Sequence, residues 1–168
     1  CGGVPTISCT VHSLVKAKLR DTGAPFAGEM SGHLFFNDGR WPGFDDGVYA
    51  GARILEILSR EADPSAALEA LPSAVNTPEL QIRMAEGENK AFIARLQKEA
   101  RFDDALDVIT IDGVRVEWND GFALARSSNT TPVVVLRLEG DTPEALERIK
   151  KTFAEVLLKV EPSLELPF

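Results

Sequence analysis

The chain has 168 residues, of which 44% are hydrophobic and 26% charged, a composition typical of a folded globular protein. It has no apolar stretch long enough to cross a membrane, and residues 1–10 lack the basic start and apolar run of a secretory signal, so we expect a cytoplasmic protein. The net charge of -8 disfavours nucleic acid and anionic membranes as partners, and it means that any anionic ligand must be held by a local group of donors.

In the first half, the pattern predicts a short helix over 13–22 that ends at Gly23, and a short strand over 33–36 followed by the turn Asn37-Asp38-Gly39. Residues 45–60 have the period of an amphipathic helix, and a second short helix is expected over about 64–70. The apolar positions that share one face of the longer helix are Val48, Gly51, Ala52, Leu55 and Leu58.

Residues 71–78 contain two prolines and no hydrophobic periodicity, which is typical of a linker. We therefore expect two domains, over residues 1–72 and 73–168.

The second half predicts strands over 79–84, 106–111, 114–118, 121–126 and 132–138, and helices over 89–100 and from Pro143 onward. Asp112-Gly113 and Asp120-Gly121 are expected to form tight hairpin turns. Thr142 is the expected N-cap of the last helix. The fold class predicted is an α/β partial domain followed by an α+β domain, in which an antiparallel sheet is covered on one side by two helices.

Two segments have the residue types of a ligand site. Residues 28–33 place Glu29, Ser31 and His33 between glycines, and a carboxylate, a hydroxyl and an imidazole suit a sugar ring. Residues 126–132 offer Arg126, hydroxyl and amide side chains and no acidic residue, which suits a phosphate. Both segments are also compatible with ordinary polar turns.

Two other polar features favour a structural interpretation. Asp45 or Asp46 is expected to cap the following helix, although adjacent carboxylates can bind a cation. His12, before the first helix, is more often structural than functional. With two histidines and the cysteines Cys1 and Cys9, a zinc site is not expected. The cysteines are expected to be free thiols, with a disulfide between them as the alternative.

Taken together, three segments resemble the α-D-phosphohexomutases: Gly28-Glu29-Met30-Ser31-Gly32-His33, then Gly43-Phe44-Asp45-Asp46-Gly47, then Arg126 to Pro132. The methionine after Glu29 is similar to the bacterial phosphomannomutase/phosphoglucomutase branch, with the phosphoglucosamine mutase branch as an alternative. The resemblance covers nearly the whole chain. It implies that residues 1–72 are the C-terminal part of a sugar-binding third domain, and that residues 73–168 are a phosphate-binding fourth domain.

The resemblance also implies residue roles. Glu29 and Ser31 would bind the sugar hydroxyls, His33 would lie near the reacting end, and His12 would be a nearby polar contact. The phosphate that is not transferred would be held by four residues: Arg126, Ser128, Asn129 and Thr130. The ligands implied are mannose or glucose 1- and 6-phosphates and a bisphosphorylated intermediate.

In the complete enzyme, the resemblance implies a phosphoserine that donates the phosphoryl group and an Mg²⁺ ion that stabilises the charge. No serine loop or Asp-Gly-Asp-Gly-Asp metal loop of the family's type is found, so these parts are expected in missing N-terminal domains, and the chain alone is expected to be inactive. The family's usual Trp-Lys-Thr-Gly before the histidine is replaced by Ser8-Cys9-Thr10-Val11. Two alternatives stay open: a noncatalytic phosphosugar- or anion-binding module, and a structural interaction domain.

Overall fold

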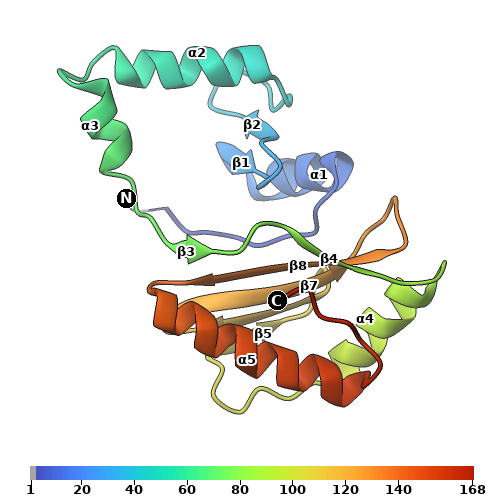
Figure 1. Ribbon diagram of the computed structural model, residues 1–168. Coiled ribbons are helices and arrows are strands. Elements are labelled where there is room, and N and C mark those ends of the chain that lie inside the picture. The colour runs from blue at the N-terminus through green and yellow to red at the C-terminus, as the bar shows by residue number, and fades with distance from the viewer. Residues whose placement is uncertain (1–2) are drawn as a thin grey trace. The chain divides into compact units, whose positions relative to one another are not determined.

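The computed structural model describes residues 3–168 and divides the chain into two compact units, Cys1–Pro72 and Ser73–Phe168. The possible pairing of Cys1 with Cys9 falls partly outside the described residues and stays a prediction. Each unit is shown in Figure 1. No helix in the described residues is long and apolar enough to cross a membrane.

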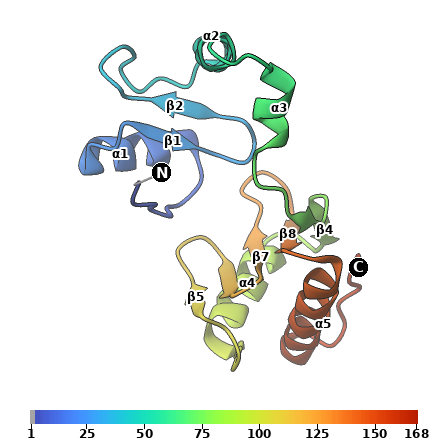
Figure 2. The same cartoon turned by 90° about the vertical axis from the view of Figure 1, so that its left-hand side faces the viewer.

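The first unit is built around a two-stranded antiparallel hairpin of β1 (Phe26–Gly28) and β2 (Leu34–Phe36). Helix α1 (His12–Thr22) contacts β1, and α2 (Gly47–Leu58) contacts β2, as Figure 2 shows. Helix α3 (Pro64–Glu69) follows. The buried core of this unit is small and consists of Val15, Leu19 and Phe35. The predicted helices are present, whereas β1 was not predicted.

The apolar face predicted for α2 is not buried within the described residues. Val48 is 86% exposed and Leu55 is 66% exposed. The side of α2 that meets β2 instead carries Tyr49 and Arg53, which pack against the ring of Phe36 at 5.4 and 5.6 Å between centres. The helix was therefore predicted correctly, but its amphipathic pattern did not identify the side that contacts the hairpin.

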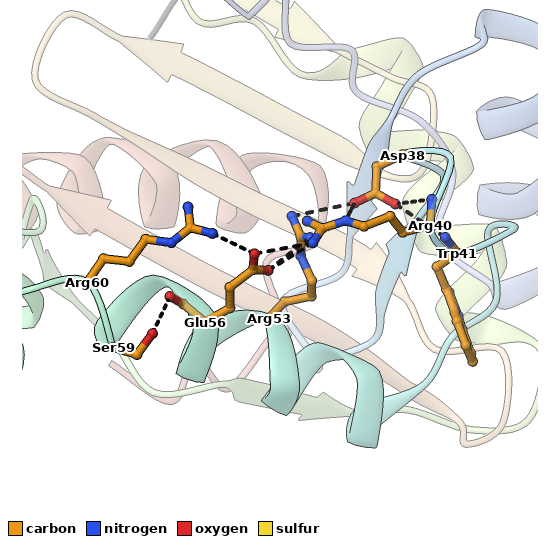
Figure 3. Close-up of polar contacts among 7 residues, drawn as sticks. All are labelled: Asp38, Arg40, Trp41, Arg53, Glu56, Ser59 and Arg60. Atoms are coloured by element: carbon orange, nitrogen blue, oxygen red, sulfur yellow. Dashed lines mark hydrogen bonds and ion pairs between the residues drawn. The ribbon is translucent and has the colours of Figure 1, made fainter.

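Charged side chains join α2 to the segment after β2, as Figure 3 shows. Glu56 accepts hydrogen bonds from Arg40 at 3.1 and 3.2 Å and from Arg60 at 2.7 Å. Arg53 lies between Glu56 at 3.2 Å and Asp38 at 3.4 Å. Because this network links residues 38–40 to two turns of α2, it fixes the segment that leads from β2 into the helix.

The second unit is an all-antiparallel sheet covered by two helices. Its main strand order is β3-β8-β7-β6-β5, and β4 also pairs with β8. The strands are β3 (Val75–Asn76), β4 (Leu80–Arg83), β5 (Asp107–Ile109), β6 (Val114–Trp118), β7 (Gly121–Ser127) and β8 (Val133–Gly140). Helices α4 (Glu88–Glu99) and α5 (Pro143–Val160) pack against the sheet (Figure 1), so the predicted α+β class is confirmed.

The core of this unit lies between the sheet and the helices. Alternate residues of β6, β7 and β8 are buried, and α5 contributes the apolar stripe that its sequence period predicts. Thr142 caps α5 by accepting a hydrogen bond from Ala145 N at 3.2 Å. The strands alternate because one face is packed and the other is open, which leaves Arg115, Arg126 and Arg137 on the face away from the helices.

Three local expectations need correction. Asp112-Gly113 is not a two-residue hairpin turn, because Ile109 pairs with Arg115 and a longer connection joins β5 to β6. Residues 71–78 are not entirely a linker, because Val75 and Asn76 form β3 on the edge of the second sheet and Thr77 N donates to Leu138 O at 2.9 Å. The second hairpin turn is Asn119-Asp120 rather than Asp120-Gly121, because Gly121 is already paired with Trp118 in the ladder.

Candidate functional site

The segment from Glu29 to His33 is the loop that connects β1 to β2. Glu29 N donates to His33 O and Gly32 N donates to Glu29 O, each at 2.9 Å, so the loop is a tight turn. Gly32 has φ +88, a conformation that glycine adopts without steric cost. The turn leaves Ser31 and His33 exposed and Glu29 half-buried. The segment predicted to bind a ligand is therefore a tight polar turn of the hairpin.

Asp45 holds the ring of His33. Its Oδ2 lies 2.7 Å from His33 Nδ1, and its Oδ1 accepts a hydrogen bond from Leu34 N at 3.3 Å. When the imidazole is neutral, a proton on Nδ1 leaves Nε2 as an acceptor, and the carboxylate fixes this arrangement. The side chain of His33 is still 52% exposed, so the ring remains accessible to a ligand.

The neighbouring Asp46 has a different task. It is the N-cap of α2, and its Oδ1 accepts a hydrogen bond from Tyr49 N at 2.9 Å. One carboxylate of the pair thus starts the helix, as the sequence predicts, and the other orients His33. The sequence did not predict the second role, because residues 33 and 45 are twelve positions apart and meet only in the folded unit.

His12 is the first residue of α1, and its ring lies 5.2 Å from the ring of Phe35. Val11, just before it, donates its N–H to Glu29 Oε1 at 3.0 Å. The start of α1 is thereby tied to the turn that carries Glu29. Val11 has φ +97, the one positive φ of a non-glycine residue among those described, so the backbone at this point is strained.

In the second unit, residues 128–132 connect β7 to β8. Ser128 Oγ accepts hydrogen bonds from Thr130 N and Thr131 N, both at 3.3 Å, and from Thr131 Oγ1 at 2.9 Å. Ser128 N donates to Val133 O at 2.9 Å. The hydroxyl of Ser128 therefore organises the loop by accepting hydrogen bonds from the two threonines that follow it. Asn129 and Thr130 are exposed, and Ser128 is half-buried, so none of the three is packed in an apolar core.

Arg126 lies near the end of β7, on the open face of the sheet. Its Nη1 lies 3.1 Å from Asp112 Oδ2, and a quarter of its side chain is exposed. Gly113, beside Asp112, has φ +94, and a Cβ there would lie 2.2 Å from Ala125 O and 2.7 Å from Arg126 Cβ. The turn after β5 therefore approaches the arginine so closely that it requires glycine.

The eight candidate residues thus fall into two groups of four. Glu29, Ser31, His33 and His12 belong to the first unit, and Arg126, Ser128, Asn129 and Thr130 belong to the second. A cavity of about 660 Å³ in the second unit, between β4, α4 and residues 161–165, is lined by none of the eight. Among residues 3–168, no cluster of three or more carboxylate, imidazole or thiol groups could hold a metal ion.

Comparison with known proteins accounts for nearly the whole chain. The family model described as phosphoglucomutase/phosphomannomutase, alpha/beta/alpha domain III, matches residues 3–75. The model described as the C-terminal domain of the same proteins matches residues 79–156.

Among curated relatives, a phosphomannomutase/phosphoglucomutase from Pseudomonas aeruginosa is 50% identical over 168 residues, which are 99% of this chain and 36% of the relative. A phosphoglucomutase from Neisseria gonorrhoeae is 53% identical over 157 residues, or 93% of this chain and 34% of the relative. The chain therefore spans about a third of the length of these relatives.

A crystal structure of a phosphoglucomutase/phosphomannomutase family protein from Burkholderia thailandensis has a TM-score of 0.91 and 60% sequence identity, and the match covers 99% of this chain and 35% of that one. The two domain models, the curated relatives and the solved structure all point to the same family. The chain belongs to the phosphoglucomutase/phosphomannomutase family, and it corresponds to the C-terminal portion of its members.

Proposed function

We propose that this chain is the substrate-binding part of a phosphomannomutase/phosphoglucomutase, an enzyme that interconverts hexose 1-phosphates and 6-phosphates through a phosphoserine and a bisphosphorylated sugar. In this proposal the first unit binds the sugar and the second binds the phosphate that is not transferred. The names of the relatives support the reaction class.

The observation that carries the proposal is the loop after β7. Arg126 provides a guanidinium, which can contact two phosphate oxygens at once. Asn129 and Thr130, in the loop that follows β7, carry an amide and a hydroxyl and are exposed. Residues 126–132 contain no carboxylate in a chain whose net charge is -8, and Arg126 forms an ion pair with Asp112. A phosphate dianion can therefore compete with the Asp112 carboxylate for the guanidinium of Arg126.

The first unit supports the sugar-binding half of the proposal by its exposed polar side chains. Ser31 can donate and accept a hydrogen bond, and Glu29 retains one carboxylate oxygen beyond the one that accepts from Val11. Asp45 orients His33, so the imidazole presents a fixed edge to a sugar hydroxyl or a phosphoryl oxygen. We propose that His12, at the start of α1, adds a polar contact.

The described residues do not fit the Mg²⁺ ion that the family resemblance implies, because they contain no suitable cluster of ligands. We therefore assign the ion and the phosphoserine to parts of a longer protein. What this chain contributes is positioning and charge complementarity, which account for much of the catalysis of phosphoryl transfer. We expect purified chain to show no mutase turnover at physiological substrate concentrations, and turnover in a sample free of longer enzyme would refute this division of roles.

Binding can be tested on the chain itself with two matched arginine variants. Arg126 and Arg115 are on neighbouring strands, have side chains that are 25% and 26% exposed, and each form an ion pair with a carboxylate. We expect glucose 1-phosphate to bind the unaltered chain with a dissociation constant on the order of millimolar, because the chain provides only part of a complete site. Arg126→Gln should abolish measurable binding and Arg115→Gln should retain it. Equal affinity of the two variants would contradict the assignment of the phosphate to this loop.

A further inference from the structure

Asn89, in the first turn of α4, is buried against residues 128–132, the loop proposed above to bind phosphate (the phosphate loop). The residue is 3% exposed, and among residues 3–168 the one other buried polar residue is Thr77. Asn89 Nδ2 carries two N–H donors, which are shared among three backbone oxygens: Ser128 O at 3.2 Å, Thr131 O at 3.3 Å and Val133 O at 3.3 Å. All three partners can only accept, so the amide nitrogen, not the amide oxygen, must face them.

These contacts join residues that are about forty positions apart in the sequence. The side chain reaches both ends of the loop, because Ser128 follows β7 and Val133 begins β8. From the other direction, Ser128 Oγ holds the N–H groups of Thr130 and Thr131. The loop is thus pinned by its carbonyl groups to Asn89 and by its amide groups to its own serine.

A five-residue loop of small polar side chains would otherwise sample many conformations, and fixing it when a ligand binds carries an entropic cost. A loop that is already held in one conformation binds more tightly, because that cost has been met on folding. The position of Asn89 at the start of α4 does not itself explain these contacts, since the helix N-cap is Gly87 and no side chain caps the helix.

We propose that Asn89 is a positioning residue of the phosphate site, which holds residues 128–133 in their anion-binding conformation before the anion arrives. This proposal rests on the function proposed above. Asn89 is buried and touches the loop backbone, so its effect on the ligand passes through the loop. Removing its N–H donors should lower the affinity for phosphate more than removing a buried hydrogen bond elsewhere in the second unit does.

The test compares Asn89→Leu with Thr77→Val in the 168-residue chain. Leucine has nearly the size of asparagine but no donor. Thr77 is also buried, and it bonds to the same strand near its other end, where its Oγ1 accepts from Leu138 N at 3.2 Å. Each variant therefore loses buried hydrogen bonds to β8 or its adjoining loop, but only one loses bonds to the phosphate loop.

Binding of glucose 1-phosphate and the amide hydrogen exchange of residues 128–133 are measured for both variants. Asn89→Leu should weaken binding by about tenfold, equivalent to about 1.4 kcal/mol, and should speed exchange in the loop. Thr77→Val should leave affinity within about twofold of the unaltered chain. If Asn89→Leu does not fold, Asn89→Ser, which keeps one donor on a shorter side chain, should show the same weakening to a smaller degree.

Unchanged affinity in the foldable Asn89 variant, or an equal loss in Thr77→Val, would overturn the positioning role. Failure of the unaltered chain to bind glucose 1-phosphate at all would instead contradict the proposed function. The two ideas are therefore separated by one set of titrations.

Discussion

Replacing Val11 by glycine is expected to stabilise the first unit. Val11 has φ 97 and ψ 123 at the start of α1, and its side chain makes no capping hydrogen bond. A β-branched residue at positive φ places its Cβ against the adjoining carbonyl group. Glycine has no Cβ, so it relieves this contact while keeping the N–H that donates to Glu29 Oε1.

The magnitude follows from two opposing terms. A residue held in a disfavoured backbone region costs about 1–3 kcal/mol. Glycine costs about 0.4–1 kcal/mol more than a residue with a side chain in lost unfolded-state entropy. Val11 is 44% exposed, so the burial lost when its side chain is removed is modest. The net expectation is a gain of about 1 kcal/mol in the free energy of unfolding of the first unit.

The assay is amide hydrogen exchange at Val15 and Leu19, the buried residues of α1, because exchange reports the opening free energy of one segment separately from the other unit. Val4→Gly is the control, since Val4 is 92% exposed and has no positive φ. The control should leave exchange in α1 unchanged. If Val11→Gly speeds exchange at these amides, the reasoning about backbone strain at the start of α1 is wrong.

Three further predictions concern other parts of the chain. Gly113→Ala should destabilise the second unit by about 3 kcal/mol or more, because its Cβ would overlap Ala125 O at a positive φ; chemical denaturation checks this, and a loss below about 1 kcal/mol would contradict it. Asp46→Ala should cost α2 about 1 kcal/mol by removing the cap on Tyr49 N, read as faster exchange in that helix, with unchanged exchange as the contrary result. Hydrogen bonds from Ser163 and, second, from Arg95 lower the pKa of Glu161. The stability from these contacts is therefore present above the ordinary glutamate pKa and is lost as the pH falls through the lowered value. NMR of the C-terminal segment should show that it loosens on acidification, and Glu161→Gln should abolish that change.

The second unit follows closely from its sequence because its elements are specified locally. Strands β6 to β8 alternate with period two, and α5 has an N-cap, a proline in its first turn and a continuous apolar stripe. Turn residues and periodicity act over a few positions, so a single sequence is enough to place them. The hairpin shift at Asn119-Asp120 is a one-residue error of the kind that strand ends produce.

The errors lie where structure depends on distant residues. Strand β1 has only three residues, and it exists because Phe26 and Gly28 pair with Phe36 and Leu34. Strand β3 lies within a proline-containing stretch and is recruited by the end of β8. The exposed apolar side of α2 has the sequence pattern of a buried face, but the helix packs on the hairpin through Tyr49 and Arg53, which contact the ring of Phe36.

The candidate site shows the same division. Its loops were recognisable from residue types such as glycine, serine and arginine in short segments. The residues that hold those loops were not, because Asp45 reaches His33 across twelve positions and Asn89 reaches Ser128 across thirty-nine. Supporting contacts of this kind follow no fixed spacing that a single sequence could reveal. In addition, asparagine and aspartate are common at the start of helices, so their presence there does not point to a contact with a distant loop.

The most direct test of the proposed phosphate site is a map of the chain's amide chemical shifts during titration with glucose 1-phosphate. We expect saturable changes at Arg126 to Thr131, with the largest at Asn129 and Thr130, whose side chains are exposed in the loop. Changes centred on Ile82 and Phe92, which line the cavity of about 660 Å³, or no change at the loop when other amides saturate, would contradict the account.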